Sequence, residues 1–285
     1  MNTGGRRIAL TGVPRSGTTL CCRLLGEADN AVALFEPMEV ERLPQDDPEA
    51  ALDMIDAFFA QSRASLLAQG RAISNHVGGA VPDNPFGHQR GTDGQRIRQA
   101  HRGEIRIDKP LGPAFTLVIK HNAAFTALLP QLATRFETFA VIRNPLAVLA
   151  SWHSVDLPVT QGRMPAGERL DPSLRARLDA EPDRVGRQLL LLDWVFSRYA
   201  AYLPPERILA YEQVVASGGA VLARATGLAV PCRPLEERNA SRLYDAGQCR
   251  GLAERLLAAP GAWRDYYRET DIVDLADGLA AGGGA

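Results

Sequence analysis

One stretch, G-V-P-R-S-G-T-T-L at residues 12–20, constrains the fold of this chain more than any other. A short apolar segment at 6–11 comes directly before it, and an apolar pattern with helical spacing follows it. The order strand, glycine loop, helix is typical of α/β proteins with a parallel sheet. The N–H groups and the dipole of such a helix favour an anion at the loop, although a glycine-rich turn without a ligand is the alternative.

The loop departs from the Walker A pattern G-x-x-x-x-G-K-[ST] at one position. Gly12 and Gly17 keep the glycine spacing, and Thr19 keeps the hydroxyl residue. Thr18 occupies the lysine position, and the loop carries a cation earlier, as Arg15. In nucleotide triphosphatases that lysine contacts the β- and γ-phosphates, so this loop suits a phosphate better than a metal-bridged triphosphate.

Further short apolar segments alternate with helical patterns along the chain. They predict strands at 31–35, 115–120, 136–142 and 207–212. We therefore expect residues 1–285 to form a single three-layer α/β domain of the P-loop-like type, with a mainly parallel sheet of about five strands.

Three segments do not fit this alternation. Residues 44–104 read as an insertion, helical at first and loop-like from about 75 onward, and residues 158–182 read as a polar loop or lid. Both are expected to frame the pocket for a second substrate. The end of the chain, 276–285, reads as a disordered tail.

Composition narrows the functional classes. A net charge of −1 gives no support for nucleic-acid binding, and no apolar run is long enough to cross a bilayer. The four cysteines form no C-x-x-C pair and have no histidine partners, so we expect no metal site. The polar N-terminus resembles no signal peptide, and we expect a soluble cytoplasmic protein; nothing indicates its oligomeric state.

A second motif, R-N-P-L-A-V-L-A-S, follows the strand at 136–142. Pro145 is typical of a first helical turn, which puts Arg143 at the helix entrance and Ser151 about two turns along it. An arginine fork and a hydroxyl brought together in this way would grip a phosphate; a surface ion pair is the alternative for Arg143.

Together, P-R-S-G-T-T-L and R-N-P-x-x-x-x-x-S resemble the two nucleotide motifs of sulfotransferases that use 3′-phosphoadenosine 5′-phosphosulfate (PAPS). The resemblance covers roughly residues 6–36 and 115–230, and its motif style is closest to bacterial and tyrosylprotein-type enzymes. It implies a transferase of class EC 2.8.2.-, with PAPS as co-substrate, 3′-phosphoadenosine 5′-phosphate (PAP) as product and no required metal. With no membrane anchor in view, a bacterial cytoplasmic enzyme fits best.

The resemblance also implies roles for particular residues. The 5′-phosphosulfate would lie among the loop residues Arg15, Ser16, Gly17, Thr18 and Thr19. The 3′-phosphate would lie between Arg143 and Ser151. Tyr211, in a Y-E segment, would lie near the nucleotide, although a core tyrosine at the sheet edge fits equally. A late loop would close over the nucleotide through one of three residues: Arg238, Ser241 or Arg242.

Catalysis needs a base for the acceptor hydroxyl and a cation for the leaving oxygen. Lys120 ends a predicted strand and is similar to the strand-end lysine of the family, which assists the leaving group. Glu36 follows the strand at 31–35 and is the favoured base, and His121 is the competing one. In the cytosolic enzymes one residue separates that lysine from the histidine, whereas here none does.

Two other classes remain open at this point. The first is a nucleotide kinase or NTPase of the same broad fold, and the second is a catalytically inactive nucleotide-binding protein. The acceptor of a transferase would carry a hydroxyl, on a carbohydrate, a lipid-linked sugar, a phenolic compound or a peptide tyrosine.

Overall fold

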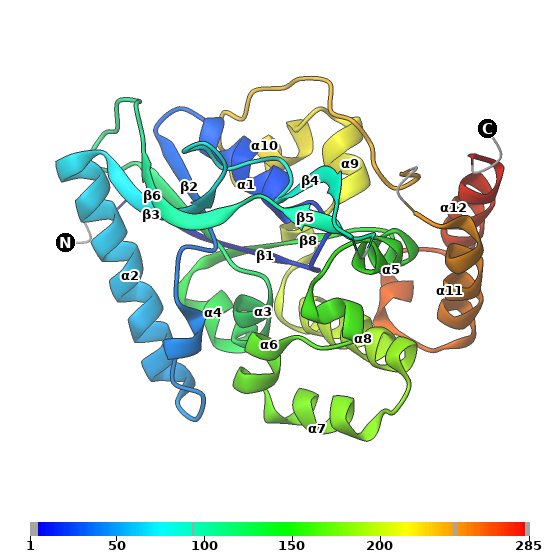
Figure 1. The fold of residues 1–285 in the computed structure, drawn as a ribbon. Coiled ribbons are helices and arrows are strands. Elements are labelled where there is room, and N and C mark those ends of the chain that lie inside the picture. The colour runs from blue at the N-terminus through cyan, green and yellow to red at the C-terminus, as the bar shows by residue number, and fades with distance from the viewer. Residues whose placement is uncertain (1–4, 93, 242–243, 283–285) are drawn as a thin grey trace.

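The computed structural model describes residues 5–92, 94–241 and 244–282 (Figure 1). Within them the main sheet has five strands in the order β2, β7, β1, β8, β9, and every neighbouring pair is parallel. The strands are β1 (Arg7–Gly12), β2 (Ala31–Phe35), β7 (Thr116–Lys120), β8 (Glu137–Ile142) and β9 (Ile208–Ala210). The expected α/β fold with a mainly parallel sheet is confirmed.

Helices cover both faces of the sheet (Figure 1). Ile8 and Leu10 of β1 pack among the helices of one face, whereas Ala9 between them packs on the other, as the alternation along a strand requires. The first face carries α1 (Thr18–Glu27), α9 (Tyr211–Ala216) and α10 (Ala220–Thr226). The second carries α2 (Pro48–Gln69), α3 (Ala123–Ala127), α4 (Leu129–Arg135), α5 (Pro145–His153) and α8 (Arg184–Tyr202).

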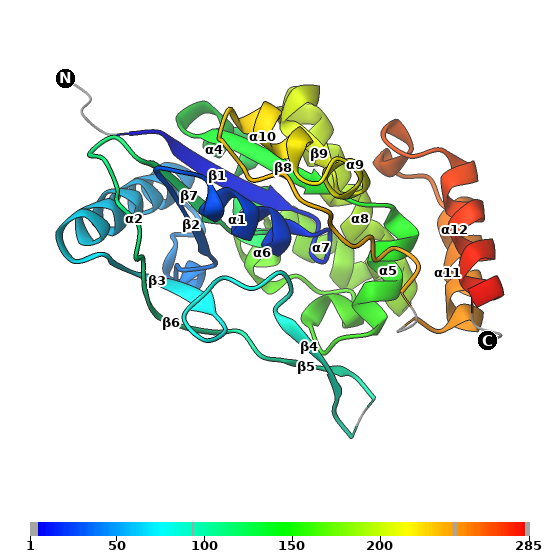
Figure 2. The same cartoon turned by 90° about the horizontal axis from the view of Figure 1, so that it is seen from above.

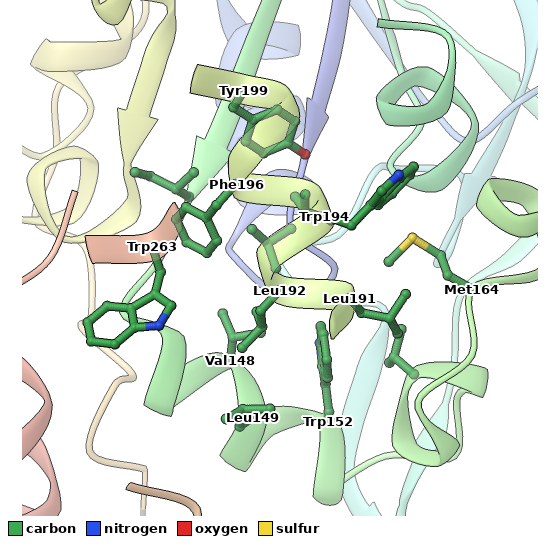
Figure 3. Close-up of a cluster of buried hydrophobic side chains, with 14 of the residues drawn as sticks. Val148, Leu149, Trp152, Met164, Leu191, Leu192, Trp194, Phe196, Tyr199 and Trp263 are labelled. Carbon is green, nitrogen blue, oxygen red and sulfur yellow. The ribbon is translucent and has the colours of Figure 1, made fainter. Parts of the chain in front are cut away.

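Helices α5 and α8 form the largest apolar cluster (Figure 3). Leu192 and Phe196 on α8 are fully buried, and so is Trp152 on α5. The indole N–H of Trp152 donates a hydrogen bond of 2.8 Å to the carbonyl of Pro14 in the glycine loop. Trp152 therefore fixes the position of the glycine loop relative to α5, and so relative to Ser151, the residue before Trp152.

The segment 44–104 is more regular than the sequence suggests. After η1 (Val40–Arg42) and α2, it forms two antiparallel pairs: β3 (Arg71–His76) with β6 (His101–Arg106), and β4 (Phe86–Arg90) with β5 (Arg96–Arg98). The loop expected beyond residue 75 is thus wrong for the β4–β5 part. Its prolines lie outside the strands, and the short strands have partners that a local pattern does not reveal.

The segment 158–182 is helical, where a polar loop or lid is expected. It contains η2 (Pro158–Gln161), α6 (Pro165–Leu170) and α7 (Pro172–Ala180). Each of the three begins at a proline, which is favourable at the first position of a helix although it breaks a helix interior. The prolines that suggest a loop in the sequence are helix starts in the fold.

The C-terminal part packs as a helical pair beside α5 (Figure 2). After η3 (Pro205–Arg207) and β9, the chain continues through α11 (Ala246–Ala258), η4 (Ala262–Asp265) and α12 (Glu269–Gly282). The tail expected at 276–285 is helical as far as Gly282, because Leu279 is buried beside Ala150 and Cys249. Of the helices described, none combines the length and the apolar character required to span a bilayer.

Candidate active site

The carboxyl ends of the five parallel strands bring the predicted residues together. Gly12 ends β1, Glu36 follows β2, Lys120 ends β7, Arg143 follows β8 and Tyr211 follows β9. Such ends meet at one edge of a parallel sheet, where ligands of α/β proteins bind. Except for Gly12, these residues line one cavity of about 1030 Å³. The sequence predicts Tyr211 within the strand at 207–212, whereas in the structure it is the first residue of α9.

The glycine loop turns tightly between β1 and α1. Gly17 has φ of +86° and precedes Thr18, the first residue of α1. A Cβ atom at Gly17 would lie 2.4 Å from Cδ2 of Tyr211, so only glycine allows this approach. Gly17, Thr18 and Thr19 line the cavity at the N-terminus of α1, where the first N–H groups of a helix lack helical partners.

Ser16 is the loop residue whose polar groups do not face the cavity. Its side chain is fully buried, and its hydroxyl donates a hydrogen bond of 2.7 Å to the carbonyl of Val141 on β8. Its backbone N–H donates to the carbonyl of Val13. Ser16 therefore braces the loop against the sheet.

Arg15 connects the loop to two other parts of the chain. Its Nε donates to Oγ of Ser151 at 3.1 Å, and its Nη1 donates to Oδ1 of Asn84 at 3.1 Å. Its guanidinium carbon lies 4.9 Å from the ring centre of Phe86. The side chain thus reaches the predicted 3′-phosphate residue Ser151, and it joins α5 to the segment that precedes β4.

Arg143 lies on the same side of the loop as Arg15. Its Nη1 donates to the carbonyl of Arg15 at 3.0 Å, and its guanidinium carbon lies 4.7 Å from the ring centre of Tyr211. Its Nε and Nη2 donate to Oδ1 of Asn239 and to the carbonyl of Arg238, both at 2.6 Å. These bonds use three of the five N–H donors of the guanidinium and leave two for a ligand.

The late loop that the sequence analysis singles out therefore contacts Arg143. Arg238 and Ser241 line the cavity, and the hydroxyl of Tyr211 donates a 3.4 Å hydrogen bond to the carbonyl of Glu236. Arg242, the third predicted contact, lies outside the described residues. Asn239, which the sequence analysis missed, is the side chain that fixes Arg143.

Positive charge accumulates at this end of the cavity. Burial and the charges of Arg96, Arg143 and Arg238 together lower the pKa of Arg15 to about 9. Arg15, Arg96 and Arg143 donate their hydrogen bonds to neutral oxygen atoms. Mutual repulsion among these cations is relieved by an anion, which makes this the electrostatically favoured place for one.

Lys120 and Glu36 form an ion pair at the neighbouring strand ends. Nζ of Lys120 lies 2.6 Å from Oε1 of Glu36, and the lysine side chain is only 2% exposed against 30% for the glutamate. Burial raises the pKa of Glu36, but the charges of Lys120 and His121 outweigh it, and the net shift is downward. Glu36 is ionised at neutral pH, as a general base must be.

Two site residues, Arg15 and Glu36, have an unusual backbone conformation. Among the described residues, the non-glycine residues with positive φ are Arg15 (+74°), Asn30 (+49°) and Glu36 (+44°). This conformation is costly for residues with a Cβ atom and concentrates at functional sites. At Glu36 it is held by a hydrogen bond of 2.8 Å from its own N–H to the carbonyl of Lys120.

His121 lies behind Glu36 and is not among the residues that line the cavity. Its side chain is buried, and its Nε2 accepts a hydrogen bond of 3.2 Å from the backbone N–H of Met38. Burial lowers the pKa of the imidazole to about 4. The lone pair that a base would use is already occupied, so the geometry favours Glu36 over His121.

The segment 83–98 supplies residues that the sequence analysis did not assign to the site. Asn84, Phe86 and Arg96 line the cavity beside Arg15, and Arg98 reaches 4.0 Å from Oε2 of Glu36. The run P-D-N-P-F indicates a turn, and the arginines that follow it do not stand out in a chain with 32 arginines and lysines. These residues lie at the cavity because the segment packs beside the end of α5, where the backbone N–H of Arg96 donates to the carbonyl of Ser154.

The described residues contain no cluster of three or more histidine, cysteine, aspartate or glutamate side chains placed to hold a metal ion.

No protein-family model matches the chain, and no curated protein matches it significantly. Two solved structures with similarity are sulfotransferase STF1 from Mycobacterium tuberculosis and a sulfotransferase from Alicyclobacillus acidocaldarius. Both are sulfotransferases. The first has 13% identity and a TM-score of 0.36 over 90% of this chain and 77% of its own. The second has 12% identity and a TM-score of 0.38 over 91% and 98%. Similarity this distant assigns no activity, which must be inferred from the site.

Proposed function

We propose that this protein is a sulfotransferase that moves a sulfuryl group from PAPS to a hydroxyl of an acceptor. One observation carries the proposal: Arg15, Arg143 and Ser151 are linked beside a glycine loop that lacks the Walker lysine. A cationic site of this kind, next to a helix N-terminus, suits a nucleotide with phosphate groups on two sides of its ribose.

In the proposed complex, the 5′-phosphosulfate lies at the N-terminus of α1, where Gly17, Thr18 and Thr19 line the cavity. The free N–H donors of Arg143 take the 3′-phosphate. Without the nucleotide, Arg15 donates a hydrogen bond to the hydroxyl of Ser151. In the complex this hydroxyl binds the same phosphate group, either in place of its bond with Arg15 or in addition to it. Tyr211 packs over the loop and holds Arg143 against it.

Transfer then requires an in-line displacement at sulfur. The carboxylate of Glu36 removes the proton of the acceptor hydroxyl as the oxygen attacks. The new S–O bond forms while the bond from sulfur to the bridging oxygen of the phosphosulfate breaks. The electron pair stays on that oxygen, and PAP leaves with the added negative charge.

Lys120 has one role in the free protein and another when the donor is bound. In the free protein its ammonium group pairs with Glu36. When the donor is bound, the same group stabilises the charge that develops on the bridging oxygen. Its movement away from Glu36 leaves that carboxylate free to accept the proton.

The experiment is transfer of ³⁵S from labelled PAPS to a panel of hydroxyl acceptors in excess EDTA, with PAP binding followed by calorimetry. We expect PAP binding and a labelled product that survives the chelator. Strict dependence on magnesium with ATP as donor would establish the kinase alternative. PAP binding with no labelled product from any acceptor would establish an inactive nucleotide-binding protein.

A further inference from the structure

The cavity has two ends of different chemistry. At one end lie Arg15, Arg96, Arg143 and Arg238, where the donor phosphates are placed by the proposed function. The other end lies around Glu36 and Lys120. The walls there determine which acceptors reach the base.

One wall of the second end is an apolar strip that belongs to η2 and α6. The strip residues that line the cavity are Leu157, Pro158, Val159, Met164, Pro165 and Ala166. The α6 part of the strip lies next to the base, whereas Leu157 at its other end follows Val155, which forms a β-bridge with Arg96. Ala166 packs in the same cluster as Met38 and Val40, and Arg169 of α6 donates to the carbonyls of Val40 and Leu43.

The opposite side of this end carries apolar residues and, besides the reacting groups, one polar residue, Asn122, whose buried Oδ1 has no hydrogen-bond partner within the part of the chain that the structure describes. Phe35 and Ala123 line it, on either side of Lys120. The ammonium group of Lys120 lies 4.7 Å from the ring centre of Phe35. An acceptor placed with its hydroxyl at Glu36 is thus enclosed between this surface and the strip.

The charges near the strip are already matched within the protein. Arg163 lines the cavity, but its guanidinium pairs with Glu168 at 2.5 Å and with Asp179 at 2.7 Å. Lys120 pairs with Glu36. Arg98 and Glu41, the other charged side chains of this end, are exposed, and Arg98 lies 4.0 Å from Oε2 of Glu36. An anionic acceptor would find no buried cation without a carboxylate partner among the described residues here, in contrast to the donor end.

We infer that the acceptor is a neutral alcohol or phenol with an apolar body, which packs against the strip 157–166 and presents its hydroxyl to Glu36. The inference rests on the proposed function and names its substrate class. A carboxylate or sulfate on the acceptor would be desolvated without a partner, and the hydroxyls of a bare sugar would face apolar atoms. An apolar body instead gains free energy in proportion to the area that it buries.

The test compares acceptors that differ by one group. 2-Naphthol is measured against 6-hydroxy-2-naphthoate, which adds a carboxylate, and against methyl glucoside, which offers only sugar hydroxyls. We expect kcat/KM for 2-naphthol to exceed that for either of the others by at least about ten-fold. Equal or better turnover of the carboxylate or the sugar overturns the inference, as does the absence of product from 2-naphthol.

A matched pair of variants locates the acceptor. Leu157 is half-buried in the strip, and Leu67 is 45% exposed on α2, away from the cavity. Leu157→Ser is expected to raise the KM for 2-naphthol about ten-fold, whereas Leu67→Ser leaves it unchanged. An unchanged KM for 2-naphthol in Leu157→Ser contradicts the placement. The comparison of acceptors uses the unaltered protein and does not depend on the folding of either variant.

Failure of this inference is distinguishable from failure of the proposed function. If PAP does not bind in calorimetry, the proposed function itself is wrong. If PAP binds and the charged or sugar acceptor receives the sulfuryl group while 2-naphthol does not, the protein is a sulfotransferase with an acceptor of another class.

Discussion

Nζ of Lys120 lies 2.6 Å from Oε1 of Glu36, and this contact joins the carboxyl ends of the neighbouring strands β7 and β2. The lysine is buried and the glutamate is partly exposed to the cavity. The pair therefore sets the protonation state of the proposed base, and it keeps a cation beside the place where the leaving group would develop charge.

The first prediction concerns the identity of the base. Glu36→Gln keeps a hydrogen-bond acceptor for Lys120 but cannot take a proton, and turnover is expected to fall by about 10²–10⁴. PAP affinity, which depends on Arg143 and the loop, is expected to stay nearly unchanged. Steady-state kinetics and calorimetry measure the two effects. His121→Ala is the control, since its imidazole accepts from Met38 inside the protein; a dead His121→Ala beside an active Glu36→Gln would reverse the assignment.

The second prediction concerns pH. The net lowering of the pKa of Glu36 keeps it ionised below the usual glutamate value of about 4.3. The rate is therefore expected to stay level from pH 7 downward and to fall only below about pH 4.3.

The stability of the fold is expected to decrease with falling pH for the same reason. The ion pair contributes above the unfolded pKa, and its contribution is lost as the pH falls through the lower folded pKa. A kcat/KM profile with circular dichroism at each pH checks both, and an acid limb near pH 6.5 would exclude Glu36 as the base.

The third prediction concerns the 3′-phosphate. Arg143→Lys removes the planar fork but keeps the charge, and PAP affinity is expected to fall by about 10–100-fold because charge-assisted hydrogen bonds contribute about 1.5–3 kcal/mol. Adenosine 5′-phosphate has no 3′-phosphate, and its affinity is expected to change little. Calorimetry with both nucleotides on both proteins measures the difference. An equal loss for the two nucleotides would mean that Arg143 acts on the fold or on the 5′ side.

The fourth prediction concerns the glycine loop. In Gly17→Ala the new Cβ meets Tyr211 at 2.4 Å in addition to the strain of φ +86°. Gly78 also has positive φ, but a Cβ there meets nothing within 4 Å, so Gly78→Ala measures the strain alone. We expect Gly78→Ala to cost about 1 kcal/mol in the free energy of unfolding and Gly17→Ala to cost more, with loss of PAP binding. Denaturant unfolding gives both values, and equal costs would mean that the loop does not press against Tyr211.

Local sequence patterns were sufficient to predict the strands of the sheet and many residues of the candidate site. Buried parallel strands are short continuous apolar runs, and they stand out between helical patterns. Because the residue after each such strand lies at one sheet edge, Glu36, Lys120 and Arg143 were predictable as neighbours before any coordinates. Arg15 and Gly17 were visible through the spacing of the glycines.

Tertiary packing decided what local pattern does not encode. Short antiparallel strands within 71–106 pair over distances that a window of sequence does not span. The helices of 158–182, which begin at prolines, pack against α3 and α8. Asn239 reaches Arg143 from 96 residues away.

The choice between two candidate bases shows the same division. Glu36 and His121 both follow strands and both carry a titratable group, so the sequence leaves both as candidates although it favours Glu36. The imidazole of His121 is buried, and its Nε2 accepts a hydrogen bond from the N–H of Met38. Glu36 instead lines the cavity and pairs with Lys120. Sequence determines which groups arrive at the sheet edge because strand direction is local. The direction that each side chain faces depends on desolvation and on partners that are distant in the chain, and only the folded molecule supplies these.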